Sequence, residues 1–445
     1  MLTTSSNSAF AASDHRRCRF PRPAGQDAQP SHHVPPVLVF VWFSMILFAN
    51  CTTKNDVTIH AKPGATLYVA QAQFINTRGS DGEVHPSPGP ARLEILTRTQ
   101  TGWDREILED PQSKVFHKAI WYKPPFEEPG VLTIGATEAY LKLWRKNSSA
   151  WTAETLWHPT FGGTFDRLRD FEVGDVTGDH IDDVVIATHD QGVVAVACWD
   201  DSVYRIDELT RQAETFVHEI EIGDVDGDGI MEIFSTPSRP NKLDGSIQPG
   251  EIHMFKTQAG RWANRLVDRL ESRHAKEILC ATLFGEDRPV LFAALEGESL
   301  GRQDQNRDST TIRMYRFAAD QITSSDVAGL PGEMCRFLTF GDTDGDGRGE
   351  LVASTKSSGI WKLTPPGSPD STAWHRELIA TGSSGFEHAT CLVDLDEDGV
   401  AELYVASDDQ GELRCYRFDG KKYQQSLVSP LKADVITFNI GTHPF

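Results

Sequence analysis

Four acidic loops recur along the chain with nearly one spelling, and each could hold a divalent cation. Oxygen-bearing side chains stand at positions 1, 3 and 5 of each loop, and a carboxylate follows at position 9. This alternation directs several oxygens of one tight turn at a single point, and oxygen is the ligand atom that Ca²⁺ prefers. The predicted ligands of up to four structural Ca²⁺ ions are Asp175, Thr177, Asp179 and Asp183; Asp224, Asp226, Asp228 and Glu232; Asp342, Asp344, Asp346 and Glu350; and Asp394, Asp396, Asp398 and Glu402.

The first loop departs from the pattern of the other three. Thr177 replaces an aspartate at position 3, and His180 stands where the other loops have a glycine after position 5. Because glycine adopts a positive φ there without steric cost, we rank the first loop lowest. Acidic surface turns that bind nothing are the alternative, which fits a single loop better than four loops in register.

Short β-branched and aromatic runs flank the loops, for example 221–223 before the second loop and 232–236 after it. Such runs predict strands, so each loop joins two antiparallel strands rather than two helices. The interval between the second and third loops is much longer than the other two. It contains a hidden copy at 278–292, which keeps the apolar runs but has Thr282 in place of the first aspartate.

A second signature counts the repeats independently: an alternating strand, a polar turn, an aromatic residue and another strand recur seven times, once without the aromatic residue. Repeats of about 50 residues with four short strands are typical of a β-propeller. We therefore predict an all-β fold, a seven-bladed β-propeller at 65–445 that is closed by pairing of the C-terminal strand with the N-terminal blade. The expected blades are 115–164, 165–215, 216–272, 273–331, 332–383, 384–430, and 431–445 together with 65–113.

The four loops and their flanking strands resemble the FG-GAP and VCBS-type repeats, a family that includes the propeller of integrin α-subunits. The resemblance covers 165–430 through the loops and is fainter over the rest of the globular part. It implies a propeller with calcium bound between the first and second strands, on the lower face. It implies little about function.

The N-terminal region predicts export. Residues 1–36 are polar and rich in proline, and an unbroken apolar run follows at Val37–Ala49, which is too short to span a bilayer comfortably. The segment Phe48–Cys51 resembles a bacterial lipoprotein cleavage box, although Phe48 and Asn50 depart from its usual residues. We expect a targeting segment at 1–51 and a linker at 52–64. Lipidation at Cys51 with membrane attachment is favoured over plain secretion, and a retained anchor is the third alternative.

Net charge and cysteine content indicate which partners and which disulfides to expect. The net charge of −21 argues against nucleic acid as a partner. The seven cysteines are scattered and odd in number, so no disulfide framework is predicted. We expect a monomer whose partner is a glycan or an acidic protein.

Six basic or imidazole residues stand at one equivalent position, six residues before each loop or its counterpart. In a propeller this position lies on the upper rim of the central channel, opposite the metal loops. Long loops at 237–250, 296–309 and 76–90 are expected to rise on the same face. The six predicted rim residues are His117, Arg169, His218, Lys276, Arg336 and His388.

Three functions are compatible with such a ring. The first, which we favour over catalysis, is binding of a carbohydrate or another anionic ligand at the channel mouth. The second is β-elimination on a uronic acid or ketosugar by a lyase or dehydratase, with His218, His388 or His117 transferring the proton. The third is an adhesion or scaffold module without a small-molecule site. The basic residues could also be structural partners of the acidic residues that follow them, such as Asp170 and Glu219.

Overall fold

The computed structural model describes residues 61–443, except 79–83, 164–165, 190, 201–202, 240–248, 259, 297–308, 319–320, 333 and 368–372. Nearly all regular structure in this part is β-strand, and one short 3-10 helix lies at Asp408–Gln410. The all-β prediction is therefore confirmed. The targeting segment, Cys51, most of the linker and parts of the three long loops lie outside the described residues. The described part of the chain holds no helix with the length and hydropathy needed to span a membrane.

Five sheets contain four antiparallel strands each, and in every one of them each strand pairs with the next along the chain. Hairpins joined in this way need only short turns, which the polar segments between the strands supply. Their strands are β9 (Leu168–Gly174), β10 (Asp183–Thr188), β11 (Val194–Asp200) and β12 (Val203–Thr210); β13 (Phe216–Gly223), β14 (Glu232–Ser238), β15 (Gly250–Gln258) and β16 (Arg261–Leu270); β17 (Ala275–Ala281), β18 (Val290–Leu295), β19 (Ser309–Ala318) and β20 (Gln321–Pro331); β21 (Cys335–Gly341), β22 (Glu350–Thr355), β23 (Ile360–Thr364) and β24 (His375–Ala380); and β25 (Thr390–Val393), β26 (Glu402–Ser407), β27 (Glu412–Phe418) and β28 (Tyr423–Pro430).

A sixth sheet has nine strands and contains both ends of the described chain. One part of it is the sequential set β5 to β8, and in the other part β1 pairs with β2, β3 and β29 while β3 pairs with β4. A single residue pair, Ala72 with Val115, joins the two parts. The strands are β1 (Thr66–Arg78), β2 (Val84–Pro88), β3 (Ala91–Arg98), β4 (Trp103–Asp110), β5 (Val115–Tyr122), β6 (Gly130–Ala136), β7 (Leu141–Asn147), β8 (Ala150–Trp157) and β29 (Val435–Thr442).

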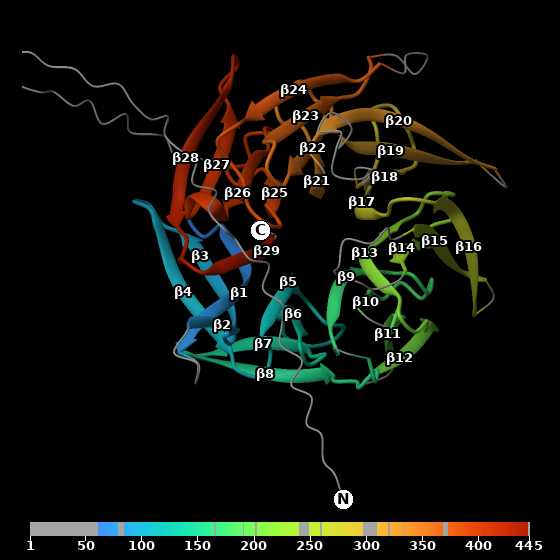
Figure 1. Ribbon diagram of the computed structural model, residues 1–445, viewed down its shortest axis with the longest axis horizontal. Coiled ribbons are helices and arrows are strands. Elements are labelled where there is room, and N and C mark those ends of the chain that lie inside the picture. Colours follow the sequence, from blue (N-terminus) through green and yellow to red (C-terminus); the bar gives the residue numbers. More distant parts are fainter. Residues whose placement is uncertain are drawn as a thin grey trace, which may run out of the picture. The chain divides into compact units, whose positions relative to one another are not determined.

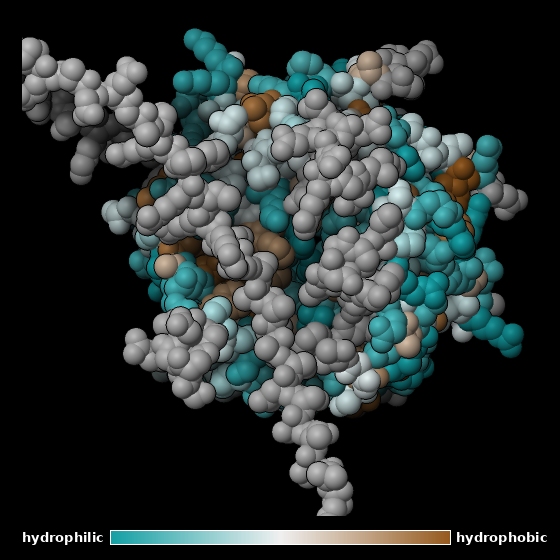
Figure 2. Space-filling model, in the orientation of Figure 1, coloured by the Kyte–Doolittle hydropathy of each residue, from teal (hydrophilic) through white to brown (hydrophobic). Residues whose placement is uncertain are grey.

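The sheets of the compact unit at 59–445 surround a common centre (Figure 1). The innermost strand of each set contacts the innermost strands of its neighbours, in the order β5, β9, β13, β17, β21, β25 and β29, and β29 contacts β5. The fourth strands, such as β8, β16 and β28, lie on the outside (Figure 1). Hydrophilic residues dominate the described part of the face shown in Figure 2.

Apolar side chains fill the spaces between neighbouring sheets. Leu132 and Ile134 of β6 pack with Val184 and Ile186 of β10, and all four are fully buried. Strand β10 is buried along its whole length because it has a sheet on each side, whereas β8 is largely exposed. Burial of each such side chain stabilises the fold by about 1.5–3 kcal/mol. This packing holds the first strands rigidly around the centre.

Candidate functional site

The first strands carry two candidate sites at opposite ends. Each of β9, β13 and β21 begins near a predicted rim residue and ends at an acidic loop. We call the end with the rim residues the upper mouth and the end with the loops the lower face.

The carboxylate at position 1 shapes each acidic loop. In the third loop, the amide of Gly345 donates to Asp342 Oδ1 (2.7 Å) and the amide of Gly347 donates to Asp342 Oδ2 (2.8 Å). The amides of Gly227 and Gly229 bind Asp224 in the same way, at 2.6 and 2.9 Å. An aspartate here therefore stabilises the turn whether or not a metal is bound.

The carboxylate at position 9 is buried beneath each loop. Glu232, Glu350 and Glu402 are fully buried, and each accepts a backbone hydrogen bond from position 2 of its loop, for example from Thr343 to Glu350 Oε2 (3.0 Å). Burial, together with Asp396, raises the pKa of Glu402 to about 8. A buried carboxylate of this kind is stabilised in its charged form by a nearby cation.

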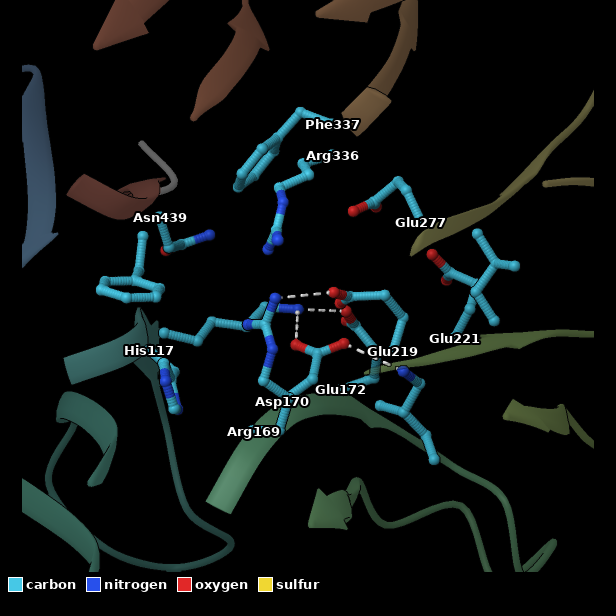
Figure 3. A pocket seen from close by; sticks show the side chains of 14 residues that line it. His117, Arg169, Asp170, Glu172, Glu219, Glu221, Glu277, Arg336, Phe337 and Asn439 are labelled. Carbon is cyan, nitrogen blue, oxygen red and sulfur yellow. Dashed lines mark hydrogen bonds and ion pairs between the residues drawn. The ribbon is translucent and has the colours of Figure 1, made fainter. Parts of the chain in front are cut away.

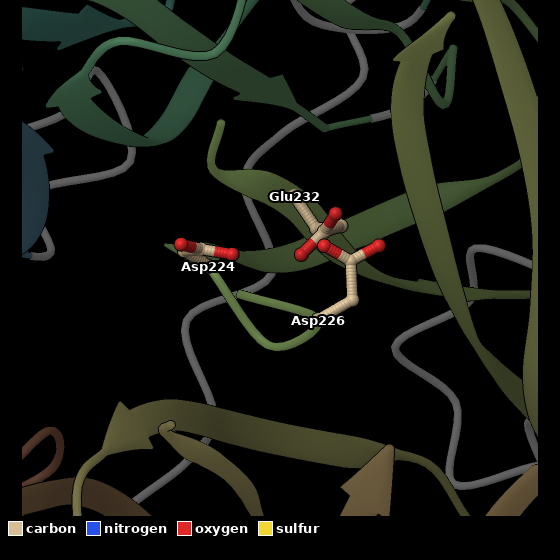
Figure 4. A group of neighbouring side chains, drawn as sticks. All are labelled: Asp224, Asp226 and Glu232. Atoms are coloured by element: carbon tan, nitrogen blue, oxygen red, sulfur yellow. The ribbon is translucent and has the colours of Figure 1, made fainter. Parts of the chain in front are cut away.

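Three loops bring the carboxylates of positions 1, 3 and 9 together. Within the described residues, three groups have ligand atoms all within 4.8 Å of one another. Figure 4 shows the second loop, in which Asp224, Asp226 and Glu232 converge. In the third loop, Glu350 Oε1 is buried and has no hydrogen-bond partner among the described residues, so this oxygen set fits a cation. The three groups are Asp224, Asp226 and Glu232; Asp342, Asp344 and Glu350; and Asp394, Asp396 and Glu402.

The position-5 aspartates lie outside these groups. Asp228, Asp346 and Asp398 each turn one oxygen to the backbone amide two residues later, at 3.0, 2.8 and 3.0 Å. These carboxylates cap the end of the turn. They do not belong to the groups formed by the ligand atoms of positions 1, 3 and 9.

The first loop has the same backbone shape as the others despite its substitutions. His180 adopts φ 67°, close to the 82° of Gly347. Asp175 accepts amide hydrogen bonds from Gly178 and His180, at 2.6 and 2.9 Å. A side chain in this left-handed region costs about 1–2 kcal/mol, which the folded loop tolerates.

Five of the six predicted rim residues lie in β-bulges. In β21, the pairing with β22 passes from Cys335 directly to Phe337, so Arg336 has no partner across the pair. A bulge adds one residue to a strand and redirects its side chain, which turns these residues toward the mouth. The same shift leaves out His117, Arg169 and Lys276, and in β13 it leaves out His218 together with Glu219.

A further bulge lies in β29 at Phe438, which the sequence analysis missed. The pairing of β29 with β1 passes from Asn439 directly to Thr437. The Phe438 ring contacts His117 edge to face, with ring centroids 4.8 Å apart. No acidic loop follows β29, so counting back from a loop could not have found this position. The asparagine that follows it, equivalent to Asp170 after Arg169, was the available signal.

His388 lies apart from the other rim residues. It precedes β25, is fully buried and has φ 56°. Its Nδ1 donates to the carbonyl of Thr355 (2.8 Å), and Ser383 donates to its Nε2 (2.6 Å). Both ring nitrogens are therefore used inside the structure.

Carboxylates match the three basic rim residues. Arg169 binds Glu219 (3.0 Å), Arg336 binds Glu387 (2.7 Å), and Lys276 binds Glu296 (3.2 Å). Glu387 is buried, and although burial opposes its ionisation, Arg336 and Arg169 hold its pKa below the usual value. Glu219 and Glu387 come from the sheet that follows that of their arginine, whereas Glu296 lies just after β18, in the same sheet as Lys276. None of the three directly follows its basic partner in the sequence.

A small polar pocket of about 50 Å³, which opens to solvent, lies below the ring. Arg169 and Arg336 point into it from opposite sides in Figure 3. Lys118 binds Asp170 (3.0 Å) and Glu172 at its wall. The lining also includes Glu221 and Glu277; burial raises the pKa of both carboxyls, with contributions from Glu172 to Glu221 and from Glu219 to Glu277.

Uncharged imidazoles surround the mouth. Burial, together with Arg167 for His189 and Lys276 for His218, lowers the pKa of each imidazole well below its ordinary value. His218 stacks on His274 with ring centroids 4.5 Å apart, and its Nε2 lies 3.5 Å from Lys276 Nζ.

Two of the imidazoles have at least one ring nitrogen that makes no hydrogen bond within the described residues. His117 donates from Nδ1 to the carbonyl of Leu168 (2.6 Å), which leaves its Nε2 as an acceptor while the ring is neutral. His189 is 7% exposed, and neither of its nitrogens has a hydrogen-bond partner among the described residues. The sequence analysis did not identify His189.

The comparisons with known proteins support the fold and little else. No protein-family model matches the sequence, and no curated protein matches it. The chain is similar in structure to a putative 6-phosphogluconolactonase from Bacteroides fragilis, with a TM-score of 0.51, 12% identity, and coverage of 86% of this chain and 99% of that chain. At this identity the similarity shows the fold alone, a β-propeller.

Two other solved structures are more distant. The periplasmic gluconolactonase of Pseudomonas aeruginosa has a TM-score of 0.47, with 12% identity and coverage of 84% of this chain and 99% of that chain. A lectin of Agrocybe aegerita that recognises non-reducing terminal N-acetylglucosamine has a TM-score of 0.46, with 11% identity and coverage of 83% and 91%.

Proposed function

We propose that the chain is a closed, seven-bladed β-propeller that binds a carbohydrate at its upper mouth. The five four-stranded sheets supply five blades, β5 to β8 supply a sixth, and β29 with β1, β3 and β4 supplies the seventh. The pairing of β29 with β1 supports closure of the ring, because it leaves both strands without a free edge there.

The ring of bulges is the observation that carries the binding site. It gathers Arg169, Lys276 and Arg336 with imidazole and phenyl rings around one opening. Carbohydrates are recognised by such mixtures, because planar rings cover their apolar faces while charged groups in fixed positions bind hydroxyls.

Charge at the mouth indicates how an acidic sugar would be held. Each basic rim residue already has at least one carboxylate partner, so a ligand carboxylate would share Arg169 and Arg336 with Glu387. Neutral hydroxyls would use His189 and the Nε2 of His117. We therefore favour an oligosaccharide with a uronic acid unit over a small inorganic anion.

Calcium binding at the acidic loops is the second part of the proposal. The loops would be FG-GAP-type sites whose ions stabilise the propeller from the lower face, opposite the mouth. A site at ten- to hundredfold saturation adds about 1–3 kcal/mol to the unfolding free energy. Export would expose the loops to millimolar calcium, which can fill sites with a Kd of about 10⁻⁴ to 10⁻³ M. Lipidation at Cys51 would attach the protein to a membrane.

Catalysis is a second candidate, and one observation favours it. Burial, with a contribution from Arg336, lowers the pKa of Lys276 to about 8, and this amine faces the neutral ring of His218. Groups with such pKa values can exchange protons near neutral pH. A lyase or dehydratase would use them to remove a proton beside a carboxylate or ketone. Turnover of uronides, followed by the absorbance of the unsaturated product, tests this candidate directly.

A glycan array that includes uronic acid oligosaccharides tests the binding function, followed by calorimetry on the best ligand. We expect the double substitution Arg336→Met and His189→Ala to weaken binding at least tenfold. Arg205→Met is the matched control, because Arg205 lies exposed on the outer strand β12. Absence of glycan binding by the parent protein would contradict the proposal and favour an adhesion or scaffold module.

A further inference from the structure

Two of the acidic loops contain a basic side chain from the same sheet. In the sheet β13 to β16, which carries the second loop, Phe255 of β15 pairs with Ile233, the residue after position 9. Lys256 follows Phe255. In the last sheet, Tyr416 of β27 pairs with Leu403, and Arg417 follows it. Lys256 and Arg417 therefore occupy one equivalent position on the third strand, beside the buried glutamate of their loops.

The ammonium group of Lys256 lies among the predicted ligands of the second loop. Its Nζ is 2.7 Å from Asp228 Oδ2 and 2.8 Å from Glu232 Oε1, and it also binds Asp226. Lys256 is only 14% exposed, so its stem is packed within the sheet. The ammonium group therefore pairs with three of the carboxylates that are the predicted calcium ligands.

Arg417 has a similar place in the fourth loop. Its Nε lies 3.1 Å from Glu402 Oε1, and its Nη2 binds Asp398. The guanidinium thus pairs with Glu402 Oε1, whereas Glu402 Oε2 accepts the backbone hydrogen bond.

Sheets without an acidic loop use the same third-strand position to fix their lower turns. In the hidden copy, Arg316 follows Tyr315 on β19 and binds both oxygens of Glu286, at 2.5 and 2.8 Å. In the sheet β5 to β8, Arg145 binds Glu127 and donates to the carbonyl of Glu128 (3.0 Å). A basic side chain of the third strand therefore binds the lower turn in both sheets.

The first and third loops have neutral residues at that position, Cys198 and Thr364. In the sheet that carries the third loop, Lys362 lies two residues before Thr364; it binds Asp344 Oδ2 (3.0 Å) in the loop and Glu377 (3.5 Å) outside it. Two buried oxygens, Asp344 Oδ1 and Glu350 Oε1, have neither a hydrogen bond nor an ion pair in the described part of the chain. The corresponding oxygens Glu232 Oε1 and Glu402 Oε1 also lack a hydrogen bond by strict geometry, but each forms an ion pair, with Lys256 or with Arg417. In the first loop, Asp183 has no ion pair with a basic side chain among the described residues; its partners are the amides of Val176 and Thr177 and the side chains of Thr177 and Cys198.

We infer that calcium binds at the first and third loops only, and that Lys256 and Arg417 serve as permanent cations in the second and fourth loops. The inference rests on the proposed calcium binding. A tethered ammonium has a high effective concentration at its site, and a metal ion entering the second loop would leave Lys256 without its carboxylate partners. The first loop, which sequence reasoning ranked lowest, is thereby ranked above the second and fourth.

Counting the bound ions tests the inference. The full chain is titrated with Ca²⁺ alone and examined by native mass spectrometry and calorimetry. We expect two ions per chain for the parent protein, and three for Lys256→Met and for Arg417→Met. The converse substitution, Thr364→Lys, supplies a tethered cation to the third loop and should reduce the number to one. Lys421→Met, in an exposed turn, is the control and should leave the number unchanged.

The outcomes separate the inference from the proposal on which it rests. Four ions in the parent protein, or an unchanged number after Lys256→Met and Arg417→Met, would overturn the inference and leave calcium binding in place. Absence of calcium from the parent and every variant would overturn calcium binding itself. Circular dichroism of each variant shows that the sheet content is retained, so that a lost ion is not mistaken for a lost fold.

Discussion

The side-chain oxygen of Asn439 accepts a hydrogen bond from the backbone amide of Ala119 (3.4 Å), just as Asp170 accepts one from the amide of Ile220 (3.0 Å). The last strand of the chain therefore contacts β5 through the same bond that joins two consecutive first strands, β9 and β13. This bond gives β29 the role of a first strand, although it lies far from β1 in the sequence.

Removal of residues 434–445 should destabilise the protein strongly. The truncated chain would lack β29, so β1 would have an unpaired edge and buried groups such as Ile440 would be lost. We expect a lower melting temperature and aggregation in size-exclusion chromatography. A chain shortened only beyond Thr442 is the control, and equal stability of the two truncated proteins would contradict the prediction.

Calcium should raise the melting temperature, and a chelator should lower it. Asp342→Asn removes one charge from the third loop while its oxygen can still accept the amides of Gly345 and Gly347. The calcium-dependent part of the unfolding free energy should fall by about 1–3 kcal/mol in this variant. Thermal melts with and without calcium measure the change. A calcium response as large as that of the parent would argue against an ion at this loop.

Arg336→Met should destabilise the protein as well as weaken ligand binding. It leaves the buried carboxylate of Glu387 with Arg169 at 3.8 Å as its remaining partner, which costs roughly 2 kcal/mol. Adding Glu387→Gln removes the uncompensated charge and should recover most of that loss without restoring binding. Urea denaturation gives the stability, and calorimetry gives the affinity. Full recovery of binding in the double variant would show that the arginine acts only on stability.

Acid should weaken the fold through His388. Burial lowers the pKa of His388 from 6.5 to about 4, so the folded state favours the neutral ring. The stabilisation is present above pH 6.5 and is lost as the pH falls toward 4, because the unfolded state binds the proton first. The loss amounts to about 3 kcal/mol. The difference in unfolding free energy between the parent and His388→Gln should shrink over this range, and a constant difference would contradict the prediction.

Local spacing explains which features the sequence predicted. The ligands of an acidic loop are at most eight residues apart, so their alternation is visible in the sequence and defines the geometry of a single turn. The same register located the bulges, because each first strand has a nearly constant length between its bulge and its loop. His117, Arg169 and Arg336 were found in this way without any knowledge of their partners.

Contacts between distant segments explain what the sequence did not predict. Lys256 enters its loop from 30 residues away, beyond a turn of variable length, so spacing alone gives no sign of it. Glu387 is next to His388 in sequence, yet it binds Arg336 of the preceding sheet. The direction of a rim side chain also depends on where its strand begins. His388 lies before the start of β25, so its side chain points into the interior rather than to the mouth.

The pairing of β1 with β29 sets the order of events in biosynthesis. Strand β1 can pair fully only after β29 has been synthesised, and such long-range pairing is slow. The sheet that contains β1 therefore stays unfinished until β29 has been synthesised. The five four-stranded sheets pair only consecutive strands, so they can form before the sheet of β1 is complete.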